Sequence, residues 1–392
     1  MNNAPDMIIL GSTGSVGRQA ADVARQLNIR VNALCAHSDV KTIECQAREF
    51  NVKACAMSDA DSAKELKTRL YDTNIKVYSG SDGICEMIAE TGTDNENGQI
   101  VENSILGEAG LKPTLATLRQ GKKLALANKE SLVVGGETVM EEARKSGHDI
   151  LPVDSEHCAI FQCLRAGRKD EIKRIILTAS GGPFFGYTSE MLRDVTLEKT
   201  LAHPTWNMGA KITVDSATLM NKGFEVIEAV HLFGVRPEQV NVVVHRESII
   251  HSAVEYIDNS IIAQMSVPDM RHCVQYALSH PERCEATTHE LDLFEVGKLT
   301  FARPDADTFV LLAKAYEAIS KGGALPAVLN AANEEAVAAF LDRKIRFCDI
   351  STVVCETADR FEFAKNEHDL DEILKIAYES RKIANGIIKN IK

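Results

Sequence analysis

The sequence predicts an α/β fold built from a doubly wound parallel sheet, a central α+β domain and a C-terminal helical bundle. Three observations lead to this prediction. Short apolar runs alternate with helical patterns as far as residue 153, a glycine-rich turn follows the first of these runs, and residues 305–392 carry only the periodicity of helices.

The strands of the first domain are predicted by short apolar runs with helical patterns between them. The runs are residues 7–10, 30–36, 53–56, 75–78, 99–103, 123–127 and 150–153. Strands joined through a helix run parallel, because only antiparallel neighbours can share a tight hairpin. The first helix is expected at 15–27 and a polar surface loop at 91–98. Residues 1–153 are therefore predicted to form a Rossmann-like sheet.

The pattern changes after residue 153. Strand-like runs at 172–179, 240–245, 253–257 and 261–266 surround long helical stretches, which predicts a mixed sheet. Further on, five apolar residues recur every three or four positions, as on a buried helix face: Leu325, Leu329, Ala332, Ala336 and Phe340. The expected domains are 1–153, 154–282 and 305–392, with a connector at 283–304.

Composition argues against two classes of partner. Lys and Arg total 44 against 56 for Asp and Glu, giving a net charge of −12, whereas a surface for nucleic acid or an anionic membrane is basic. The sequence has no apolar run of the about 18 residues that a membrane span needs, and its first residues lack the basic segment of a secretory signal. Ten cysteines without a CxxC pair are typical of reduced thiols, so a cytoplasmic location is expected.

The glycine-rich turn, GSTGSVG at 11–17, lies between the first strand and the first helix. Glycines let a backbone approach a pyrophosphate, and a helix N-terminus attracts its charge. The spacing is GxxGxxG, a variant of the dinucleotide-binding motif. A tight strand-to-helix turn without a ligand is the alternative.

The choice between NAD and NADP depends on the end of the second strand. An NAD site usually places a carboxylate there, on the ribose 2′-hydroxyl. Here the strand is followed by His37, Ser38 and Asp39, and Asp39 is more easily interpreted as the N-cap of the next helix. His37 and Ser38 could face a 2′-phosphate, so NADP is modestly favoured although no Arg or Lys is present.

Two acidic elements are candidate metal ligands. Asp154 and Glu156 follow the strand at 150–153, and in an extended segment they would point to the same side. Such a pair needs a cation, and oxygen ligands suit Mg²⁺ or Mn²⁺. The alternative is a helix that begins here, with Asp154 or Ser155 as N-cap.

The second acidic element is the predicted helix at 213–225. It places Asn221 and Lys222 on the same face as Glu225, where the three could bind phosphate and metal at neighbouring points. A surface salt bridge is the alternative. Gly223 in this helix argues against it, because a helical glycine costs about 1 kcal/mol unless something approaches closely.

Two loops complete the candidate site. TASGGPF (178–184) ends a strand with a hydroxyl and paired glycines, which is typical of an anion-binding nest. AHPTWNMG (202–209) carries the single Trp between Pro204 and Gly209 and could be a lid. An ordinary loop with one packed aromatic residue is the alternative.

Six segments resemble the 1-deoxy-D-xylulose 5-phosphate reductoisomerase family, and the resemblance runs from Met7 to the C-terminus. They are GSTGSVG (11–17), ALANKESLV (125–133), LPVDSEHCAIFQCL (151–164), TASGGPF (178–184), AHPTWNMGAKITVDSATLMNKGFEVIEA (202–229) and PAVLNAANEEAVAAFL (326–341). Some members carry Gly-Lys-Asn where this chain has His37-Ser38-Asp39, and that difference weakens the local case for NADPH.

The resemblance implies a role for each matching residue. Metal ligands would be Asp154, Glu156 and Glu225. Substrate contacts would be Lys129, Ser155, Glu156, Ser180, His203, Trp206, Ser216, Asn221, Lys222 and Glu225. The catalytic residues would be Lys129, Asp154, Glu156, His203 and Glu225. Cofactor contacts would be Thr13, Gly14, Ser15, Val16, Asn128, Glu130 and Gly209, with His37, Ser38 and Asp39 near the 2′-phosphate. Trp206 and Met208 would belong to a mobile lid at 203–209.

The resemblance also implies the reaction. NADPH and a divalent ion, Mg²⁺ or Mn²⁺ with Co²⁺ as a further option, would serve the rearrangement and reduction of 1-deoxy-D-xylulose 5-phosphate to 2-C-methyl-D-erythritol 4-phosphate, and the enzyme would be a homodimer. A related NADP-dependent reductase on the same scaffold is the alternative, and would not need the acidic cluster. A non-catalytic nucleotide sensor would leave the cluster unexplained as well.

Overall fold

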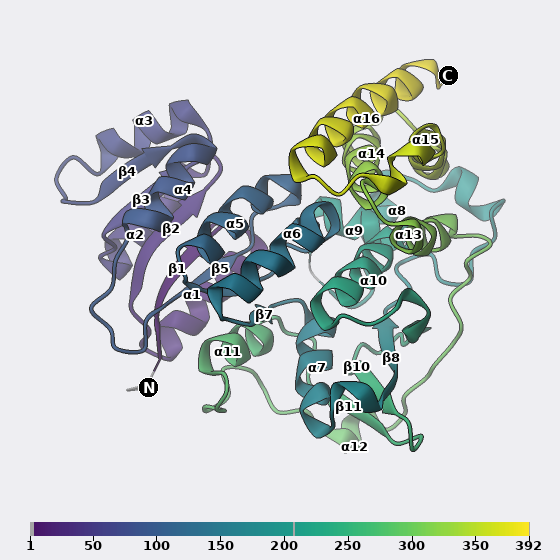
Figure 1. The fold of residues 1–392 in the computed structure, drawn as a ribbon, viewed down its shortest axis with the longest axis horizontal. Coiled ribbons are helices and arrows are strands. Elements are labelled where there is room, and N and C mark those ends of the chain that lie inside the picture. The colour runs from purple at the N-terminus through teal and green to yellow at the C-terminus, as the bar shows by residue number, and fades with distance from the viewer. Residues whose placement is uncertain (1–3, 207, 392) are drawn as a thin grey trace. The chain divides into compact units, whose positions relative to one another are not determined.

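The structure is a computed structural model that describes residues 4–206 and 208–391 (Figure 1). It divides into two compact units that share the chain in alternating segments. The first unit consists of Met1–Ser131, Val139–Cys158 and Asp269–His289, and the second of Leu132–Thr138, Ala159–Pro268 and Glu290–Lys392. Among the described residues, no helix combines the length and the apolar character needed to cross a membrane.

The first unit contains a seven-stranded parallel sheet in the order β4-β3-β2-β1-β5-β6-β7. The chain builds outward from β1 in one direction and then returns to build outward from β5 in the other. The predicted doubly wound sheet is therefore confirmed, and its order reverses between β1 and β5. The strands are β1 (Asp6–Leu10), β2 (Val31–Ala36), β3 (Ala54–Met57), β4 (Lys76–Ser79), β5 (Gln99–Asn103), β6 (Lys123–Leu126) and β7 (Ile150–Pro152).

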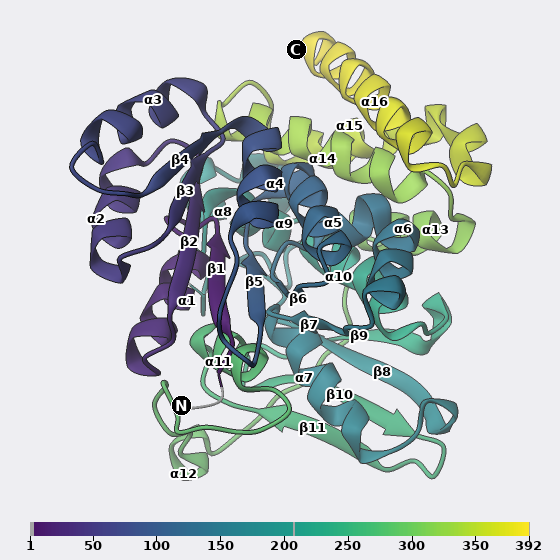
Figure 2. The same ribbon diagram turned by 60° about the vertical axis from the view of Figure 1, so that its left-hand side comes forward.

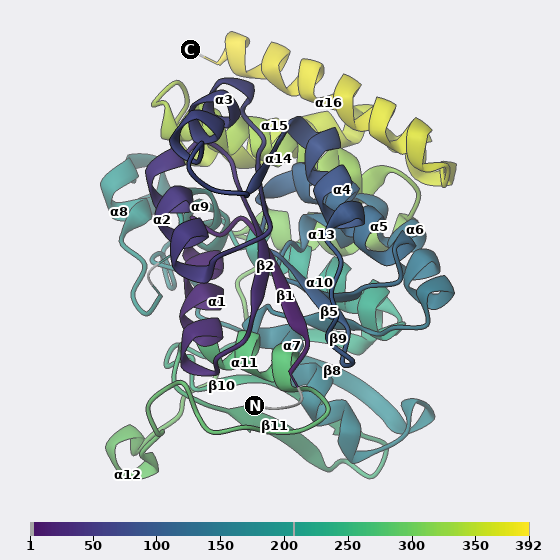
Figure 3. The same cartoon turned by 90° about the vertical axis from the view of Figure 1, so that its left-hand side faces the viewer.

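Helices cover both faces of this sheet. Figure 3 shows α1 and α2 on one face and α4 and α5 on the other. The α4 face is apolar because Ile8, Leu10 and Val101 of the strands meet Ile84 and Met87 of the helix. The helices are α1 (Ser15–Gln26), α2 (Val40–Phe50), α3 (Ala60–Arg69), α4 (Gly80–Glu90), η1 (Gly107–Gly110), α5 (Leu111–Arg119), α6 (Glu130–Ser146) and α11 (Arg271–Ser279), and residues 132–138 of α6 belong to the second unit.

The second unit contains the predicted mixed sheet, in the order β11-β10-β8-β9. Strands β8 and β9 pair in parallel, whereas β10 pairs antiparallel with β8 and β11 (Figure 2). The strands are β8 (Ile172–Ala179), β9 (Val240–Val244), β10 (Ile250–Tyr256) and β11 (Ile261–Met265). All eleven strands of the described chain coincide with a predicted run to within a few residues.

Helices make up the rest of the second unit, and residues after 309 are almost entirely helical, as predicted. Helix α14 packs against α13, α15 and α16, and all five residues of its predicted apolar face are buried. The elements are α7 (Ser155–Cys163), α8 (Leu197–Leu201), α9 (Ala210–Ala217), α10 (Met220–Phe233), α12 (Leu293–Val296), α13 (Val310–Lys321), α14 (Leu325–Leu341), α15 (Phe347–Arg360) and α16 (Leu370–Asn390), with short 3-10 turns at Leu164–Ala166, Lys169–Glu171, Met191–Asp194, Pro237–Gln239 and Glu362–Asn366.

Candidate active site

The glycine-rich turn follows β1 at the point where the sheet order reverses. Gly11 has φ +87°, a conformation that favours glycine. At Gly17 a Cβ atom would lie 2.2 Å from the Gly11 carbonyl oxygen, so only glycine lets α1 pack this closely on the turn. Gly14 is the N-cap of α1 and has no side chain to accept from the first amide groups of the helix.

A cation that the sequence did not reveal lies beside the end of β2. Asp39 caps α2 by accepting from the Thr42 amide at 3.1 Å, as predicted, and this bond lowers the pKa of its carboxyl group. Its other oxygen lies 3.5 Å from a guanidinium nitrogen of Arg18 on α1. The Nδ1 atom of His37 lies 2.6 Å from the Ser58 hydroxyl. Arg18 therefore supplies the positive charge that the segment 37–39 lacks.

Lys129 and Asp154 meet at the carboxyl ends of two neighbouring strands, β6 and β7. Their Nζ and Oδ2 atoms are 2.7 Å apart, and both side chains are buried. The Oδ1 atom of Asp154 lies 3.1 Å from Nδ1 of His157, which is fully buried. His157 is not among the residues predicted from the sequence. Its position three residues after Asp154 would have been a signal for it, because residues three apart share a helix face.

The expectation that Asp154 and Glu156 lie on one side of an extended segment is wrong. Helix α7 begins at Ser155, so the backbone turns immediately after Asp154. Asp154 instead caps this helix, because its Oδ1 accepts from the Glu156 amide at 3.1 Å. Glu156 accepts from the hydroxyl of Ser155. The alternative drawn from the sequence, a helix that begins here, describes the local backbone.

Asn128 and Glu130 flank Lys129 and are buried at the same strand ends. The amide of Asn128 donates to the carbonyls of Ile105 and Gly107 at 2.6 and 2.9 Å, and to Glu130 at 3.2 Å. Asn128 thereby fixes the loop that follows β5.

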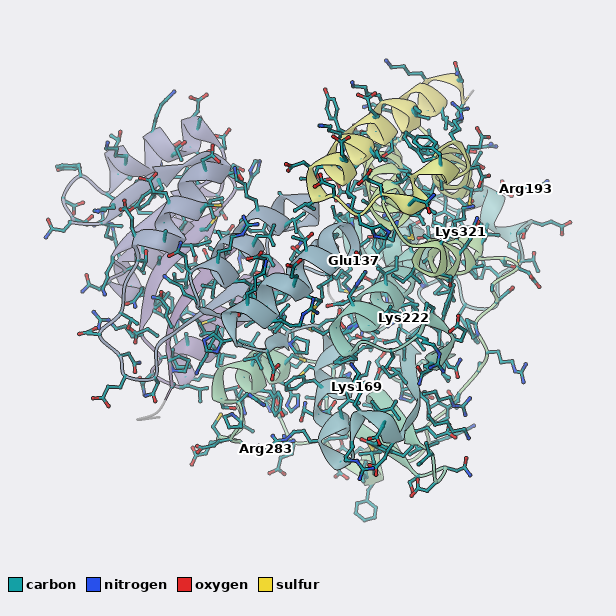
Figure 4. All side chains as sticks on the ribbon, viewed as in Figure 1. Glu137, Lys169, Arg193, Lys222, Arg283 and Lys321 are labelled. Atoms are coloured by element: carbon teal, nitrogen blue, oxygen red, sulfur yellow. The ribbon has the colours of Figure 1, made fainter. Side chains whose placement is uncertain are left out.

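In the second unit, Glu225 is the centre of a buried polar group on α10. Asn221 donates to Oε1 of Glu225 at 2.5 Å, and Lys222 forms an ion pair with Oε2 (Lys222 is labelled in Figure 4). The predicted shared face is confirmed, but the single helix predicted at 213–225 is wrong, because the chain breaks at Leu219 (φ +60°) between α9 and α10. Lys222 and Glu225 are almost fully buried, which rules out a surface salt bridge. At Gly223 a Cβ would lie 2.7 Å from that of Ala315 on α13, which explains the helical glycine.

The end of α9, which carries Ser216, is held by a second buried carboxylate. Asp215 forms an ion pair with Lys211 at 2.8 Å and accepts from the side-chain amide of Asn333 on α14, also at 2.8 Å. The helical C-terminal region therefore braces α9 through a hydrogen bond between residues 118 positions apart.

Ser180 and His203 meet beside the paired glycines. The Nε2 atom of His203 lies 3.0 Å from the Ser180 hydroxyl oxygen, and its Nδ1 accepts from the amides of Thr205 and Trp206 at 3.2 and 2.9 Å. Burial, helped by the charge of Arg246, lowers the pKa of His203 to about 4. His203 is therefore neutral at pH 7 and carries its proton on Nε2.

The loop after β8 has the backbone of a nest. Gly181 and Gly182 both have positive φ, and a Cβ on Gly182 would lie 2.7 Å from the Ser216 carbonyl oxygen. Arg246 donates to the Gly182 carbonyl at 2.9 Å, so a second unpredicted cation stands beside this loop. A basic residue directly after strand β9 was the available signal.

The single Trp is half-buried, and its ring lies 6.1 Å from that of His251, centroid to centroid. Met208 is also half-buried, and Gly209 is the N-cap of α9. Asn207, within the predicted lid, lies outside the described residues.

Family profiles match nearly the whole chain. The profile described as 1-deoxy-D-xylulose 5-phosphate reductoisomerase matches residues 7–136, that of its C-terminal domain matches 150–233, and one described as DXP reductoisomerase C-terminal domain matches 265–383. Relatives that bear the reductoisomerase name include one from Acetivibrio thermocellus, 50% identical over 97% of this chain and 98% of its own, and one from Chlorobium chlorochromatii, 51% identical over 94% and 95%.

Solved structures of the same name are also similar to this chain. The enzyme from Zymomonas mobilis in complex with NADPH has a TM-score of 0.90 and 42% identity, over 99% of this chain and 100% of that one. A DOX-P reductoisomerase in complex with NADPH, fosmidomycin and magnesium has a TM-score of 0.91 and 38% identity, with 98% of each chain covered.

Proposed function

The chain belongs to the 1-deoxy-D-xylulose 5-phosphate reductoisomerase family, and from this premise we propose how its residues divide the work of the reaction. The enzyme uses NADPH and a divalent metal ion, and it rearranges and reduces 1-deoxy-D-xylulose 5-phosphate to 2-C-methyl-D-erythritol 4-phosphate. The observation that carries the proposal is that buried carboxylates, each paired with a lysine, stand at the positions where the resemblance expects metal ligands.

We assign cofactor binding to Thr13, Gly14, Ser15 and Val16, with Asn128, Glu130 and Gly209 as further contacts. The turn fits a pyrophosphate, because Gly14 leaves the N-terminus of α1 without a capping side chain. Near His37 and Ser38, the guanidinium of Arg18 is suited to a 2′-phosphate, which supports a preference for NADPH. Bound NADPH supplies the hydride.

We assign the metal to Asp154, Glu156 and Glu225. Carboxylate oxygens are the ligands that Mg²⁺ and Mn²⁺ prefer. Asp154 and Glu225 are buried, and each is paired with a lysine ammonium group, so both carboxyl groups stand in surroundings that favour positive charge next to their oxygens. When bound, the ion acts as a Lewis acid and as a template for two adjacent substrate oxygens.

We assign the substrate phosphate to Ser180, Ser216, Asn221 and Lys222. Lys222 is a buried point charge, and the turn at Gly181 and Gly182 holds the Ser180 hydroxyl through the Gly182 amide, which donates to it at 3.2 Å, so both suit a phosphate group. His203 can donate the proton on Nε2 to a substrate oxygen, because its low pKa keeps Nδ1 as an acceptor for the backbone. Lys129 holds Asp154 in place and would share contacts to the substrate with Ser155.

We further propose that residues 203–209 close over the substrate and exclude water, with Trp206 as the covering side chain. The domain roles follow from the resemblance: NADPH binding by 1–153, catalysis by 154–282, and a C-terminal helical domain at 305–392 reached through 283–304.

A homodimer and a cytoplasmic location complete the proposal. Strand β11 lies at the edge of its sheet and exposes Ile261 and Ile262, and an apolar edge of this kind is suited to pairing with a second copy. All ten cysteines are free thiols, which suits a reducing compartment.

The test uses Glu225→Gln. This change should abolish turnover and weaken Mn²⁺ binding sharply, while NADPH binding stays within about threefold of the parent, because one anionic ligand is lost from a hard-cation site. Glu228→Gln is the control, since Glu228 is equally buried one turn along α10 but is not an assigned ligand. Activity of Glu225→Gln close to that of the parent at saturating Mn²⁺ would overturn the assignment. Full activity of the parent in EDTA would favour a related metal-independent reductase.

A further inference from the structure

A buried carboxyl group lies at the carboxyl end of β5, next to the strand that leads into the cofactor turn. Glu102 is fully buried and pairs in register with Ile9 of β1 and Ala125 of β6. None of the roles assigned above uses it. A carboxyl group in such a place needs a partner or a proton.

The hydrogen bonds around Glu102 indicate that its carboxyl group carries a proton. The Ser104 hydroxyl oxygen lies 2.9 Å from the Leu10 carbonyl oxygen and 3.2 Å from Oε2 of Glu102. A hydroxyl has one proton, so it cannot donate fully to both acceptors. Among the described residues, Oε1 of Glu102 has no hydrogen-bond partner at all. If Glu102 is protonated, its O–H donates to Ser104 and Ser104 donates to Leu10, so that every close contact becomes a hydrogen bond.

The electrostatic surroundings agree with this count. Burial raises the pKa of Glu102 to about 8, and only the Ser104 hydrogen bond opposes the shift. On the elements packed against β5, Asp6 and Lys123 lie at the opposite ends of β1 and β6. Glu102 follows Val101 along β5, so its side chain lies on the face opposite α4 and α5, where α1 and α11 pack (Figure 3). On these two helices Arg18, Arg25 and Arg271 form ion pairs with Asp39, Asp22 and Asp269, and burial lowers the pKa of His272.

Ser104 connects this carboxyl group to the cofactor turn. A Cβ on Gly11 would lie 2.8 Å from the Ser104 carbonyl oxygen and 3.1 Å from its hydroxyl oxygen, so the two residues are in tight contact. The Gly11 carbonyl in turn accepts from the Gly14 amide at 2.9 Å. A shift of Ser104 would therefore move the turn that begins α1.

We propose that Glu102 is a positioning residue that supports the cofactor turn only as a neutral acid, so that its ionisation weakens NADPH binding. The ionised form leaves Ser104 with two competing acceptors and places a negative charge beneath a turn that receives a pyrophosphate. This inference rests on the assignment of residues 13–16 to the cofactor.

The first measurement needs no variant. If only the neutral form binds well, the dissociation constant for NADPH should rise about tenfold between pH 7 and pH 9. By linkage, binding at pH 8 should take up about half a proton, which calorimetry in buffers of different ionisation enthalpy measures. A dissociation constant that is flat over this range, or binding without proton uptake, would overturn the proposal.

The second measurement uses Glu102→Gln, whose amide can donate to Ser104 at every pH. NADPH affinity should become independent of pH between 7 and 9, and proton uptake should vanish. Unfolded Glu ionises near its usual pKa of 4.5 but folded Glu102 only near 8, so the parent loses stability between these values as pH rises. The melting temperature of Glu102→Gln should therefore increasingly exceed that of the parent from pH 5 to pH 8.

Asp6→Asn is the matched control, because Asp6 is a second buried carboxyl group on the adjacent strand. Its hydrogen bonds from Thr93, Asn95 and Asn32 lower its pKa against the opposing effect of burial, so it is ionised. Asp6→Asn should lose stability at neutral pH but keep the pH dependence of NADPH affinity.

The remaining outcomes separate the possible errors. Lys122, whose pKa burial lowers to about 8, donates to Gln99 at the other end of β5, and its titration would persist in Glu102→Gln. A pH dependence unchanged in that variant would thus refute the role of Glu102. Absence of NADPH binding at any pH would instead refute the proposed function.

Discussion

At the scale of single residues, the contacts of a side chain decide its charge, as His203 illustrates. Its Nδ1 is held as an acceptor by two backbone amides, and burial together with Arg246 lowers its pKa to about 4. Free histidine takes up a proton near pH 6.5, so the folded protein loses stability as pH falls from 6.5 toward 4. Above that range His203 is a neutral donor.

We expect an NMR titration of labelled histidines to show His203 neutral at pH 6. Replacing Arg246 by Met should raise the pKa of His203, because a nearby positive charge is removed. His272, whose pKa is also lowered by burial but which has Arg283 as its charged neighbour, is the internal control and should not move. A His203 signal that titrates near 6.5 in the parent would contradict the neutral donor.

Arg18 leads to a prediction about cofactor choice. Arg18→Ala should weaken NADPH binding by about 10- to 150-fold, since a hydrogen bond to a charged group contributes about 1.5–3 kcal/mol. NADH, which lacks the 2′-phosphate, should bind as before. Arg25→Ala is the control, because Arg25 lies on the same helix but is paired with Asp22 and Glu49. Competition binding measures the affinities for NADPH and NADH. Equal losses of affinity for both cofactors would show that Arg18 only supports the helix.

Arg18, His157 and Arg246 were not predicted from the sequence, for a physical reason. Arg18 contacts Asp39 and Arg246 contacts the Gly182 carbonyl, and in both pairs the partner lies far away in the sequence or on another element. His157 contacts Asp154 only because a helix begins between them. Local patterns report periodicity and spacing, whereas these pairs depend on tertiary placement. Lys222 and Glu225 were predictable because a helix alone brings them together.

At the scale of elements, replacing a helical glycine by alanine should have opposite effects on stability in α10 and α16. Gly223→Ala should destabilise the protein by about 1–3 kcal/mol, because its methyl group would meet Ala315 at 2.7 Å. It should also lower activity, since α10 carries Asn221, Lys222 and Glu225. Gly386→Ala should stabilise by about 0.5–1 kcal/mol, because nothing lies within 4 Å of its added Cβ. Thermal unfolding and turnover of both variants test this, and a similar shift in both would contradict the packing explanation.

Strands were the most predictable elements of this chain. In a parallel sheet covered on both faces, every residue of a strand such as β2 or β5 is buried. A short run of mainly apolar residues is therefore enough to predict the strand. The start of α7 was less predictable, because Asp154 is compatible with both a strand end and a helix cap. The cap prevailed because its carboxylate accepts from the first amides of the helix.

At the scale of the whole molecule, the chain passes between its two units five times, at residues 131/132, 138/139, 158/159, 268/269 and 289/290. Helix α11 belongs to the first unit, where it packs against α1, β6 and β7, although it follows β10 and β11 of the second unit in sequence. A linear division into domains could not have predicted this, because nothing in a local pattern says where a helix docks.

A fragment of residues 1–158 should therefore fail to form a stable cofactor domain. It lacks α11, and the loss of buried Val274 and Leu278 alone removes about 3–6 kcal/mol from a domain whose stability is about 5–15 kcal/mol. Appending residues 269–289 through a flexible linker should restore a cooperative melt and NADPH binding. Circular dichroism measures the melt, and a fragment that melts cooperatively without α11 would contradict the prediction.

The late position of α11 has a consequence for synthesis. A ribosome that adds about 5–20 residues per second delivers α11 roughly 15 to 55 seconds after β1. Throughout that interval the nascent sheet lacks the helix that packs against α1, β6 and β7, while only residues 132–138 and 159–268 of the second unit, about half of it, have been made. The first unit, although it begins the chain, can therefore be completed only after residue 289 has been made, shortly before the last segment of the second unit, 290–392, follows.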